Sequence, residues 1–452
     1  MSDSHQAIEA WLRERNIVEV ECIVPDLAGV PRGKILPTDK FIEGLAGGQH
    51  RLPKNVLVHT LTGDFPPPGA VSIDVSDGDF VLEPDPATLT LVPWYDEPTA
   101  QVIADCVLRN GGHSPFYSRR VLASLLERFA DRGWHPVIAP EIEFYLVEKN
   151  TDPDQPLKPP IGASGRREAG RQEFGIDAVN EFDPFFVDLY DYCEEQKLDI
   201  DTLNHESGAG QVEINFRHGE ALRLADQVFV FKRTVRQTAQ RHGFYATFMA
   251  KPMQSEPGSA MHVHQSVYEG AERRPLFSDE DGTESAAFRH YLGGLQRFLP
   301  VFTPLMAPNV NSYRRLRFGA SKPFNVGWGY DNRIAGLRVP DAPPANRRVE
   351  NRLPGSDTNP YLAIAATLAA GYLGMTQALE PSLPVEGEAT GAFETLPLDL
   401  RTALEQFESS DEASAMFGEH FVKGLTEVVR AEYDAYLRVV SSWERKFLLL
   451  AV

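Results

Sequence analysis

The first hundred residues alternate short apolar stretches with Pro- and Gly-rich breaks. This pattern predicts β-strands separated by tight turns. Before them, residues 1–16 have the period of one amphipathic helix. We therefore expect a small, mostly antiparallel unit that follows a single helix. Its predicted strands cover residues 18–24, 31–37, 55–61, 78–84, 88–94 and 100–108.

The pattern changes after a Gly-containing break at residues 109–115, beyond which longer helices alternate with strands. Residues 118–134 and 220–243 have helical periodicity, and the last fifty residues also favour helices. Residues 359–379 are apolar nearly all round, which is typical of a buried helix. Residues 150–173 are polar and rich in Pro and Gly, which predicts a mobile loop. We expect two domains, 1–112 and 113–452, in an α+β fold.

Composition narrows the class of protein. With 42% hydrophobic and 24% charged residues, the 452-residue chain is globular in type, and its formal net charge of −20 disfavours nucleic acid as a partner. No apolar run is long enough to span a membrane, and the N-terminus lacks the pattern of an export signal. Three widely spaced cysteines favour neither a disulfide framework nor a zinc site. A cytoplasmic location is the simplest expectation.

Paired carboxylates interrupt one predicted core strand, residues 135–148. Alternation places Glu141 and Glu143 on the same face, about 7 Å apart, while Ile142 and Phe144 lie on the other. Two buried carboxylates repel each other, and a divalent cation would remove that cost. The alternative, a solvated strand face, is equally compatible with this segment alone.

Three further segments carry ligand-type residues. Residues 204–216 place Glu206 before a Gly-rich turn and Glu213 in the strand after it. Residues 260–266 place His262, His264 and Ser266 on one strand face, although histidines at this spacing are more often structural. Residues 347–352 place Arg348, Glu350 and Arg352 on one face, a pattern also typical of a surface ladder of ion pairs.

Together, five glutamates and one histidine form a hard, oxygen-rich set of ligands. That set suits magnesium or manganese rather than zinc. Arginine forks match phosphate oxygens, and arginines recur at positions 314–315, 333, 338, 348 and 352. The chain has no GxxxxGK[ST] motif, so bound ATP would be held by metal ions and arginines rather than by a glycine-rich loop.

These segments resemble the signatures of the glutamine synthetase family. The matching stretches are PEIEF, HESGAGQVE, PGSAMHVHQS, NSYRRL, DNRIAGLRVP and RRVENRLPGSDTNPYLA, which occur in the family's order. The resemblance implies an N-terminal β-grasp domain before a catalytic domain whose antiparallel strands form an open barrel. It also implies ATP as a substrate, two or more magnesium or manganese ions per site, and a homo-oligomer. The expected assembly is a dodecamer of two stacked hexamers, with sites between subunits.

The resemblance also implies a role for each matched residue. Glu143, Glu206 and Glu213 would hold one metal ion, and Glu141, His262 and Glu350 the second. Arg315 and Gly258 would bind the substrate glutamate, and Arg333 and Arg352 would stabilise the transferred phosphoryl group. The remaining matches, Arg338, Arg348, His264 and Ser266, would bind ATP.

The sequence departs from ammonia-using members of the family at two places. Six residues after Arg315, where those members carry a glutamate that handles ammonium, this chain has Ser321. Their DGSS segment is also absent, although Asp64 lies nearby and is a candidate base. The pattern resembles γ-glutamylpolyamine synthetases and favours ligation of glutamate to a polyamine or monoamine in amine catabolism. Two alternatives remain open: an ammonia-using glutamine synthetase, and a non-catalytic assembly or sensor protein.

Overall fold

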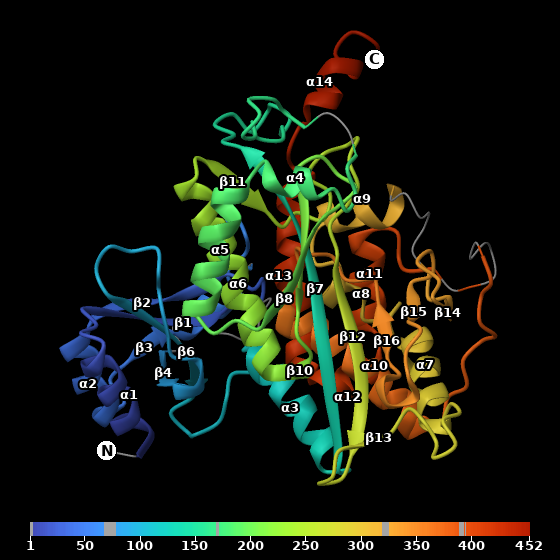
Figure 1. The fold of residues 1–452 in the computed structure, drawn as a ribbon, viewed down its shortest axis with the longest axis horizontal. Helices are drawn as coiled ribbons and strands as arrows, with labels where there is room; N and C mark the ends of the chain where they lie inside the picture. The colour runs from blue at the N-terminus through green and yellow to red at the C-terminus, as the bar shows by residue number, and fades with distance from the viewer. Residues whose placement is uncertain (1–2, 67–77, 169–170, 319–324, 388–392, 394) are drawn as a thin grey trace.

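The computed structural model describes residues 3–66, 78–168, 171–318, 325–387, 393 and 395–452. It contains two β-sheets with helices packed around them, and it confirms the expected α+β class (Figure 1). No helix in the described ranges is long and apolar enough to cross a membrane.

The N-terminal sheet has the strand order β2-β1-β6-β4-β3, with β5 beside β6. All neighbours are antiparallel except β1 and β6, which run parallel. Helices α1 and α2 accompany it. The elements are α1 (Asp3–Glu14), β1 (Glu19–Pro25), β2 (Pro31–Pro37), α2 (Thr38–Gly47), β3 (Arg51–Pro53), β4 (Asp79–Pro84), β5 (Thr90–Leu91) and β6 (Thr99–Val107).

Three expectations for this unit were wrong. Helix α2 was missed because it is short and contains Gly44 and Gly47, which lower helix propensity. Of the strand predicted at 55–61, residues Lys54–Val58 form a 3₁₀ turn that starts directly after a proline. Of the strand predicted at 88–94, only Thr90–Leu91 pairs, because a second 3₁₀ turn, capped by Asp85, runs into it.

The second sheet has the order β14-β15-β16-β12-β7-β9-β8, and short strands β10, β11 and β13 pair beside this path. Its long central strands are β7 and β12, and only β14 and β15 pair in parallel. The strands are β7 (Trp134–Glu148), β8 (Ile200–His205), β9 (Gln211–Phe216), β10 (Gly219–Glu220), β11 (Phe244–Thr247), β12 (Met261–Glu269), β13 (Arg274–Pro275), β14 (Trp328–Tyr330), β15 (Leu337–Val339) and β16 (Val349–Asn351).

Helix α10 is buried along most of its length, as its uniformly apolar sequence predicts. It packs against α3, α6 and α7. Gly294 and Gly374 let α7 and α10 approach closely, because a Cβ on Gly374 would lie 2.1 Å from a backbone oxygen of α7. The helices of the second unit are α3 (Ser118–Ala130), α4 (Ile176–Asn180), α5 (Asp183–Glu195), α6 (Ala221–Arg241), α7 (Ala286–Phe298), α8 (Thr303–Met306), α9 (Val310–Phe318), α10 (Pro360–Gln377), α11 (Leu400–Glu408), α12 (Asp411–Phe417), α13 (Glu419–Leu437) and α14 (Ser442–Leu448).

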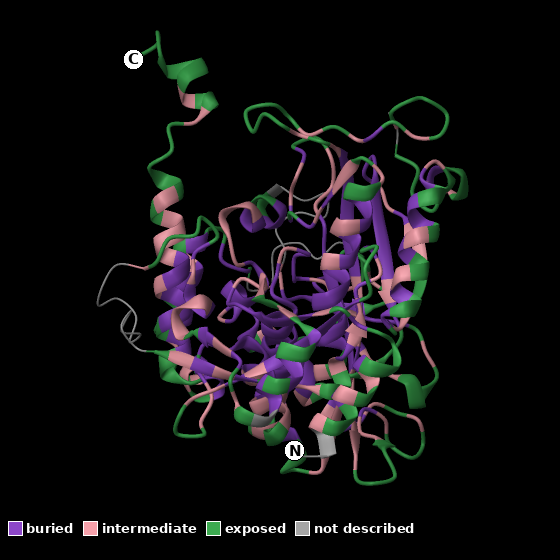
Figure 2. Cartoon of the chain, turned by 90° about the vertical axis from the view of Figure 1, so that its left-hand side faces the viewer, coloured by how far each residue is buried: buried purple, intermediate pink, exposed green. Residues whose placement is uncertain are grey.

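Buried residues from the helices and strands of both units form one continuous hydrophobic core (Figure 2). The described part of residues 150–173 is irregular, with one isolated bridge between Ile161 and Arg167. Helices α11, α12 and α13 pack against the core, whereas α14 projects from the body. The fold therefore places one deep sheet, built around β7 and β12, at the centre of the larger unit.

Candidate active site

Strand register gathers the predicted metal ligands on one face of the second sheet. Glu141 of β7 lies opposite His262 of β12, and Glu143 lies opposite Glu213 of β9. On the other side of β12, His264 pairs with Glu350 of β16. The opposite face of β7 carries core residues, as alternation predicts. Four strands thus bring together residues that are as many as 209 positions apart in the chain, from Glu141 to Glu350.

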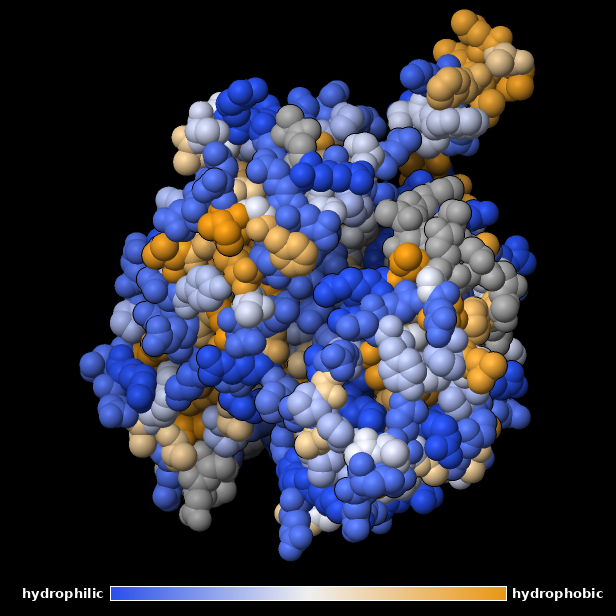
Figure 3. Space-filling model, turned by 45° about the vertical axis from the view of Figure 1, so that its right-hand side comes forward, coloured by the Kyte–Doolittle hydropathy of each residue, from blue (hydrophilic) through white to orange (hydrophobic). Residues whose placement is uncertain are grey.

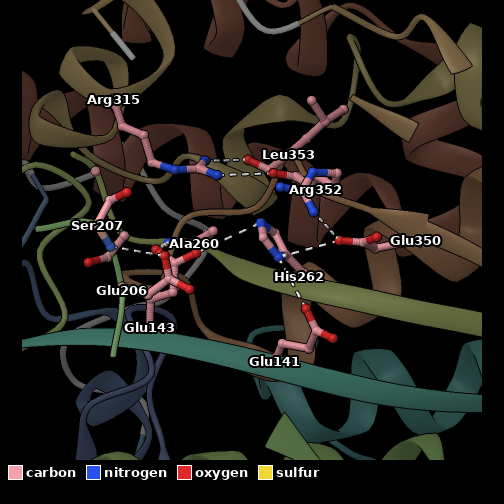
Figure 4. Close-up of polar contacts among 12 residues, drawn as sticks. Glu141, Glu143, Glu206, Ser207, Ala260, His262, Arg315, Glu350, Arg352 and Leu353 are labelled. Carbon is pink, nitrogen blue, oxygen red and sulfur yellow. Dashed lines mark hydrogen bonds and ion pairs between the residues drawn. The ribbon is translucent and has the colours of Figure 1, made fainter. Parts of the chain in front are cut away.

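Glu141 and the two histidines form the first half of the cluster, and Figure 4 shows Glu141 beside His262. His264 Nε2 is 2.9 Å from Glu141 Oε1, and His262 Nδ1 is 3.3 Å from Glu141 Oε2. The same Nδ1 lies 3.5 Å from Glu350 Oε1. Burial and nearby Arg352 lower the pKa of His262, which favours the neutral imidazole that can bind a metal.

Glu143 anchors the second half. Its Oε2 accepts hydrogen bonds from Gln211 Nε2 at 2.9 Å and from the backbone N–H of Ala260 at 3.0 Å. Burial, together with nearby Glu206, raises the pKa of Glu143 to about 8. Burial and the neighbouring carboxylates Glu141 and Glu143 raise the pKa of Glu213 to about 10. The cluster therefore holds more negative charge than its own residues neutralise.

This donor set fits divalent cations. Two groups of three ligand atoms lie within 4.8 Å of one another: Glu141, Glu213 and His262, and Glu141, His264 and Glu350. A cation bound there would relieve the repulsion that raises the pKa values of Glu143 and Glu213. The two groups share Glu141 and include His264, so they do not reproduce the division into two ligand sets that the resemblance implies. That division stays a prediction.

Arginines surround the Glu350 side of the cluster. Arg338 donates to Glu350 Oε2 at 2.9 Å, and Arg352 pairs with the other carboxylate oxygen. Arg348 Nε lies 3.2 Å from His264 Nδ1. The ladder of alternating charges at 347–352 is thus turned into the site rather than toward solvent, since Glu350 is fully buried.

Arg315 approaches the cluster from α9. Its guanidinium donates to the backbone oxygens of Leu353 at 2.7 Å and Arg352 at 3.0 Å (Figure 4). Gly258 packs directly against it, because a Cβ at that position would lie 2.6 Å from Arg315 Cγ. The two predicted glutamate-binding residues are therefore in contact, and only glycine permits that approach.

The other predicted residues lie farther out. Ser266 is half-buried on β12, opposite Val137. Arg333 is exposed between β14 and β15, and within the described ranges no hydrogen bond or ion pair joins it to the cluster. Asp64 is exposed in an N-terminal turn, where its carboxylate accepts a hydrogen bond from Thr62. Ser321 lies outside the described residues.

Sequence reasoning missed the residues that hold the ligands in place. Gln211 donates to Glu143 and to the backbone oxygen of Gly258, and Tyr145 donates to Gln211. Buried His205 bonds both Glu168 and the backbone oxygen of Glu206. A signal existed for Gln211, because it lies two residues before Glu213 and so shares its strand face.

Comparisons with known proteins match this architecture. The family model for the glutamine synthetase catalytic domain matches residues 116–448. Gamma-glutamylputrescine synthetase PuuA of Escherichia coli K12 is 31% identical over 452 residues, which cover 98% of this chain and 94% of that protein. Gamma-glutamylethanolamide synthetase GlnA4 of Streptomyces coelicolor is 33% identical, covering 97% and 94%. A solved structure described as apo GmaS without ligand superposes with a TM-score of 0.84 at 28% identity, covering 98% and 99%.

The fold and the site therefore define a ligase of the class that forms acid–amine C–N bonds. The chain belongs to the glutamine synthetase family. Enzymes of this family use ATP and divalent metal ions, which agrees with the carboxylate-rich cluster and the arginines around it.

Proposed function

We propose that this enzyme joins the γ-carboxylate of glutamate to a primary amine at the expense of ATP, through a γ-glutamyl phosphate intermediate. The observation that carries the proposal is the buried cluster of carboxylates and histidines, flanked by arginines on one sheet face. Relatives named for joining amines support the acceptor class, among them PuuA, GlnA4 and a glutamate–isopropylamine ligase of a Pseudomonas species, 30% identical over 97% of this chain.

The reaction has two steps. A γ-carboxylate oxygen of glutamate attacks the terminal phosphorus of ATP, the bond to the bridging oxygen breaks, and ADP leaves. The amine nitrogen then attacks the acyl carbon of the γ-glutamyl phosphate. The C–O bond to phosphate breaks, the nitrogen loses a proton, and the products are a γ-glutamyl amide and inorganic phosphate.

The cluster residues would hold two or more magnesium or manganese ions, with Glu143, Glu206 and Glu213 in one set and Glu141, His262 and Glu350 in the other. Bound cations would neutralise charge on the carboxylates and on the phosphates. Arg338, Arg348, His264 and Ser266 would bind ATP. Arg352 and Arg333 would stabilise charge on the transferred phosphoryl group, for which exposed Arg333 has to turn toward the site.

Arg315 would bind the carboxylate of substrate glutamate, with the backbone of Gly258 against the substrate. Burial of Arg315 lowers its pKa to about 10, and nearby Glu143 opposes that change. The guanidinium therefore stays charged at neutral pH, as carboxylate binding requires.

The proposal that the acceptor is an amine other than ammonia depends on two positions in the sequence. Ser321 stands where ammonia-using members carry a glutamate, and a serine hydroxyl is a poor base. Asp64 is our candidate for the group that takes the amine proton. Because Asp64 makes no contact with the cluster of its own chain in the described ranges, it would act in the site of an adjacent subunit.

Steady-state kinetics test the function. Purified enzyme is given ATP, glutamate and magnesium with ammonium, methylamine, putrescine or spermine, and phosphate release is measured. We expect kcat/KM to be higher for at least one amine than for ammonium. The highest value with ammonium would identify an ammonia-using glutamine synthetase, and no turnover with any acceptor would favour a non-catalytic role.

A cytoplasmic ring assembly completes the proposal, with a dodecamer of two stacked hexamers as the expected form. The apolar C-terminal arm, residues 439–452, supports assembly: Trp443 is 61% exposed and Leu450 is 97% exposed in the single chain (Figure 3). Such a surface favours burial against another copy. The same proposal divides each subunit into residues 1–112 and 113–452, consistent with its two separate sheets.

A further inference from the structure

Helix α9, which carries Arg315, is attached on two sides. On one side, Asn311 forms a reciprocal pair of hydrogen bonds with the backbone of Lys251, at 2.8 and 3.0 Å. Lys251 belongs to the segment that leads to Gly258. On the other side, the start of the helix is bound to the segment that follows β16.

Asp357 makes that second attachment. Its Oδ2 accepts a hydrogen bond from Ser312 Oγ at 2.6 Å and another from Asn309 Nδ2 at 2.8 Å. Ser312 Oγ in turn accepts from the backbone N–H of Asn309 at 3.2 Å. One carboxylate oxygen thus fixes the first turn of α9, only three residues before Arg315.

The carboxylate is itself held firmly. Beside it, buried Lys232 of α6 donates to the backbone oxygen of Thr358 at 2.7 Å. Burial raises the pKa of Asp357 and lowers that of Lys232 to about 7, and the attraction between the two groups opposes both changes. A carboxylate with these partners costs less to bury than an isolated one. Asp357 is half-buried and is held through its Oδ2, whereas its Oδ1 has no hydrogen-bond partner among the described residues.

The chain segment that carries Asp357 also carries the phosphate and metal groups. Arg352 and Leu353, whose backbone oxygens accept from Arg315, lie just before it, and Glu350 lies two residues earlier in β16. Arg315 is thus tied to this segment at its guanidinium, while its helix is tied to the same segment through Asp357.

We infer that Asp357 is a positioning residue that sets the distance between Arg315 and the metal-binding cluster, and so aligns substrate glutamate for attack on ATP. The inference rests on the proposed function, in which Arg315 binds glutamate. Asp357 acts on Arg315 through α9 and through the 352–357 segment, and its negative charge also favours the charged form of the Arg315 guanidinium. A small shift of a positioned group costs catalysis or affinity even when the group itself is intact.

The test compares glutamate and ATP kinetics in Asp357→Ala, Asp357→Asn and Ser312→Ala. We expect Asp357→Ala to raise KM for glutamate by about tenfold, since two hydrogen bonds to a charged acceptor are lost. Asn keeps an acceptor oxygen, so Asp357→Asn should recover part of that loss. Ser312→Ala removes one of the two hydrogen bonds to Asp357, together with the bond from the backbone of Asn309, and should raise KM for glutamate roughly threefold. KM for ATP should stay unchanged in all three variants.

Ser410→Ala is the matched control. Ser410 caps α12 by accepting from the backbone N–H of Ala413 at 3.1 Å, and it lies outside the site, so this variant should lower stability without changing KM for glutamate.

Unchanged KM for glutamate in both Asp357→Asn and Ser312→Ala would overturn the inference while leaving the proposed function intact. Equal increases in KM for ATP and glutamate would also overturn it, because they would mean a merely structural role. If Asp357→Ala fails to fold, Ser312→Ala decides. No glutamate turnover by the unsubstituted enzyme would reject the proposed function and this inference together.

Discussion

At the scale of single residues, the site contains carboxylates that repel one another electrostatically until a cation is bound. Burial and mutual repulsion raise the pKa values of Glu143 and Glu213, whereas hydrogen-bonded histidines outweigh burial at Glu141 and hold its pKa below the usual range. Neighbouring carboxylates whose pKa values are shifted in opposite directions are common at functional sites. The cluster is therefore a source of instability in the metal-free protein.

Replacing Glu143 with alanine tests this charge balance. We expect Glu143→Ala to abolish phosphate release and to reduce the rise in melting temperature that magnesium produces, because a ligand is lost. Without metal at pH 9, above the Glu143 pKa of about 8, the variant should be as stable as the parent or more so, since a repulsive charge is gone. Glu148→Ala, on the same strand but bonded to Arg167, is the control. Near-normal turnover by Glu143→Ala in magnesium would contradict the metal assignment.

Glu432 of α13 gives a prediction about pH. Burial raises its pKa to about 7, although it accepts a hydrogen bond from the backbone N–H of Leu61. The unfolded carboxyl titrates near 4.5, so between these values the folded protein binds more protons. The stabilising contribution is full below about pH 4.5 and is lost as pH rises through 7. Glu432→Gln, which cannot ionise, should raise the melting temperature at pH 8 but not at pH 5, and equal shifts at both values would disprove the assignment.

At the scale of elements, Arg119 of α3 joins the N-terminal unit to helix α6 of the larger unit. Its guanidinium forms a two-pronged pair with Asp226 of α6, at 2.9 and 3.0 Å, and also contacts Asp85 and Asp105 of the N-terminal unit. Tyr361 of α10 donates to the same Asp226 at 2.6 Å. One arginine thus satisfies three carboxylates at the boundary between the units.

Removing Arg119 should leave those carboxylates without compensation. We expect Arg119→Met to lower the free energy of unfolding by about 3–5 kcal/mol, the usual cost of breaking a buried charged pair, as measured by urea denaturation. Arg120→Met, one residue along and paired only at the surface with Glu127, should change it by less than about 1 kcal/mol. Similar losses in the two variants would argue against a special role for Arg119.

Some of these elements could be predicted from the sequence, and others could not. Period-two alternation in β7 and β12 predicted which residues face the site, because that pattern depends only on neighbours in the chain. Helix α2 and the 3₁₀ turn at Lys54–Val58 were not predicted, since their short patterns are overridden by tertiary contacts. The partners of Arg119 lie up to 107 positions away, a pairing that no local pattern encodes. The acceptor side, with Ser321 and Asp64, stays a prediction.

At the scale of the whole molecule, the C-terminal arm extends an apolar surface away from the body (Figure 3). The rings of Trp443 and Phe447 of α14 contact each other at a tilt of 45°, with centroids 5.2 Å apart, and both side chains are exposed. Exposing an apolar segment of this kind to water is energetically unfavourable. Its burial against another subunit would add stability to an assembly without touching the catalytic residues.

Removal of residues 440–452 tests the arm. We expect the truncated protein to form smaller particles by light scattering, because apolar contacts between subunits are lost. A full-length variant with Trp443→Ser and Phe447→Ser should reproduce the effect if apolar burial, rather than length, is responsible. An unchanged particle mass in both proteins would show that the arm is not needed for assembly.

The register between β7 and β12 has a further consequence for how the chain folds. The ladder runs from Met261 opposite Ile142 to Glu269 opposite Trp134, and β16 adds Glu350 beside it. Contacts between residues so far apart in sequence form slowly, because long loops must close first. During synthesis, the site cannot be completed until Glu350 has left the ribosome, and until then the edge of β12 that pairs with β16 is open to wrong pairing. A slip of one residue would turn every ligand into the core. The alternation that allows the site to be predicted from the sequence therefore also requires that these strands pair in the correct register.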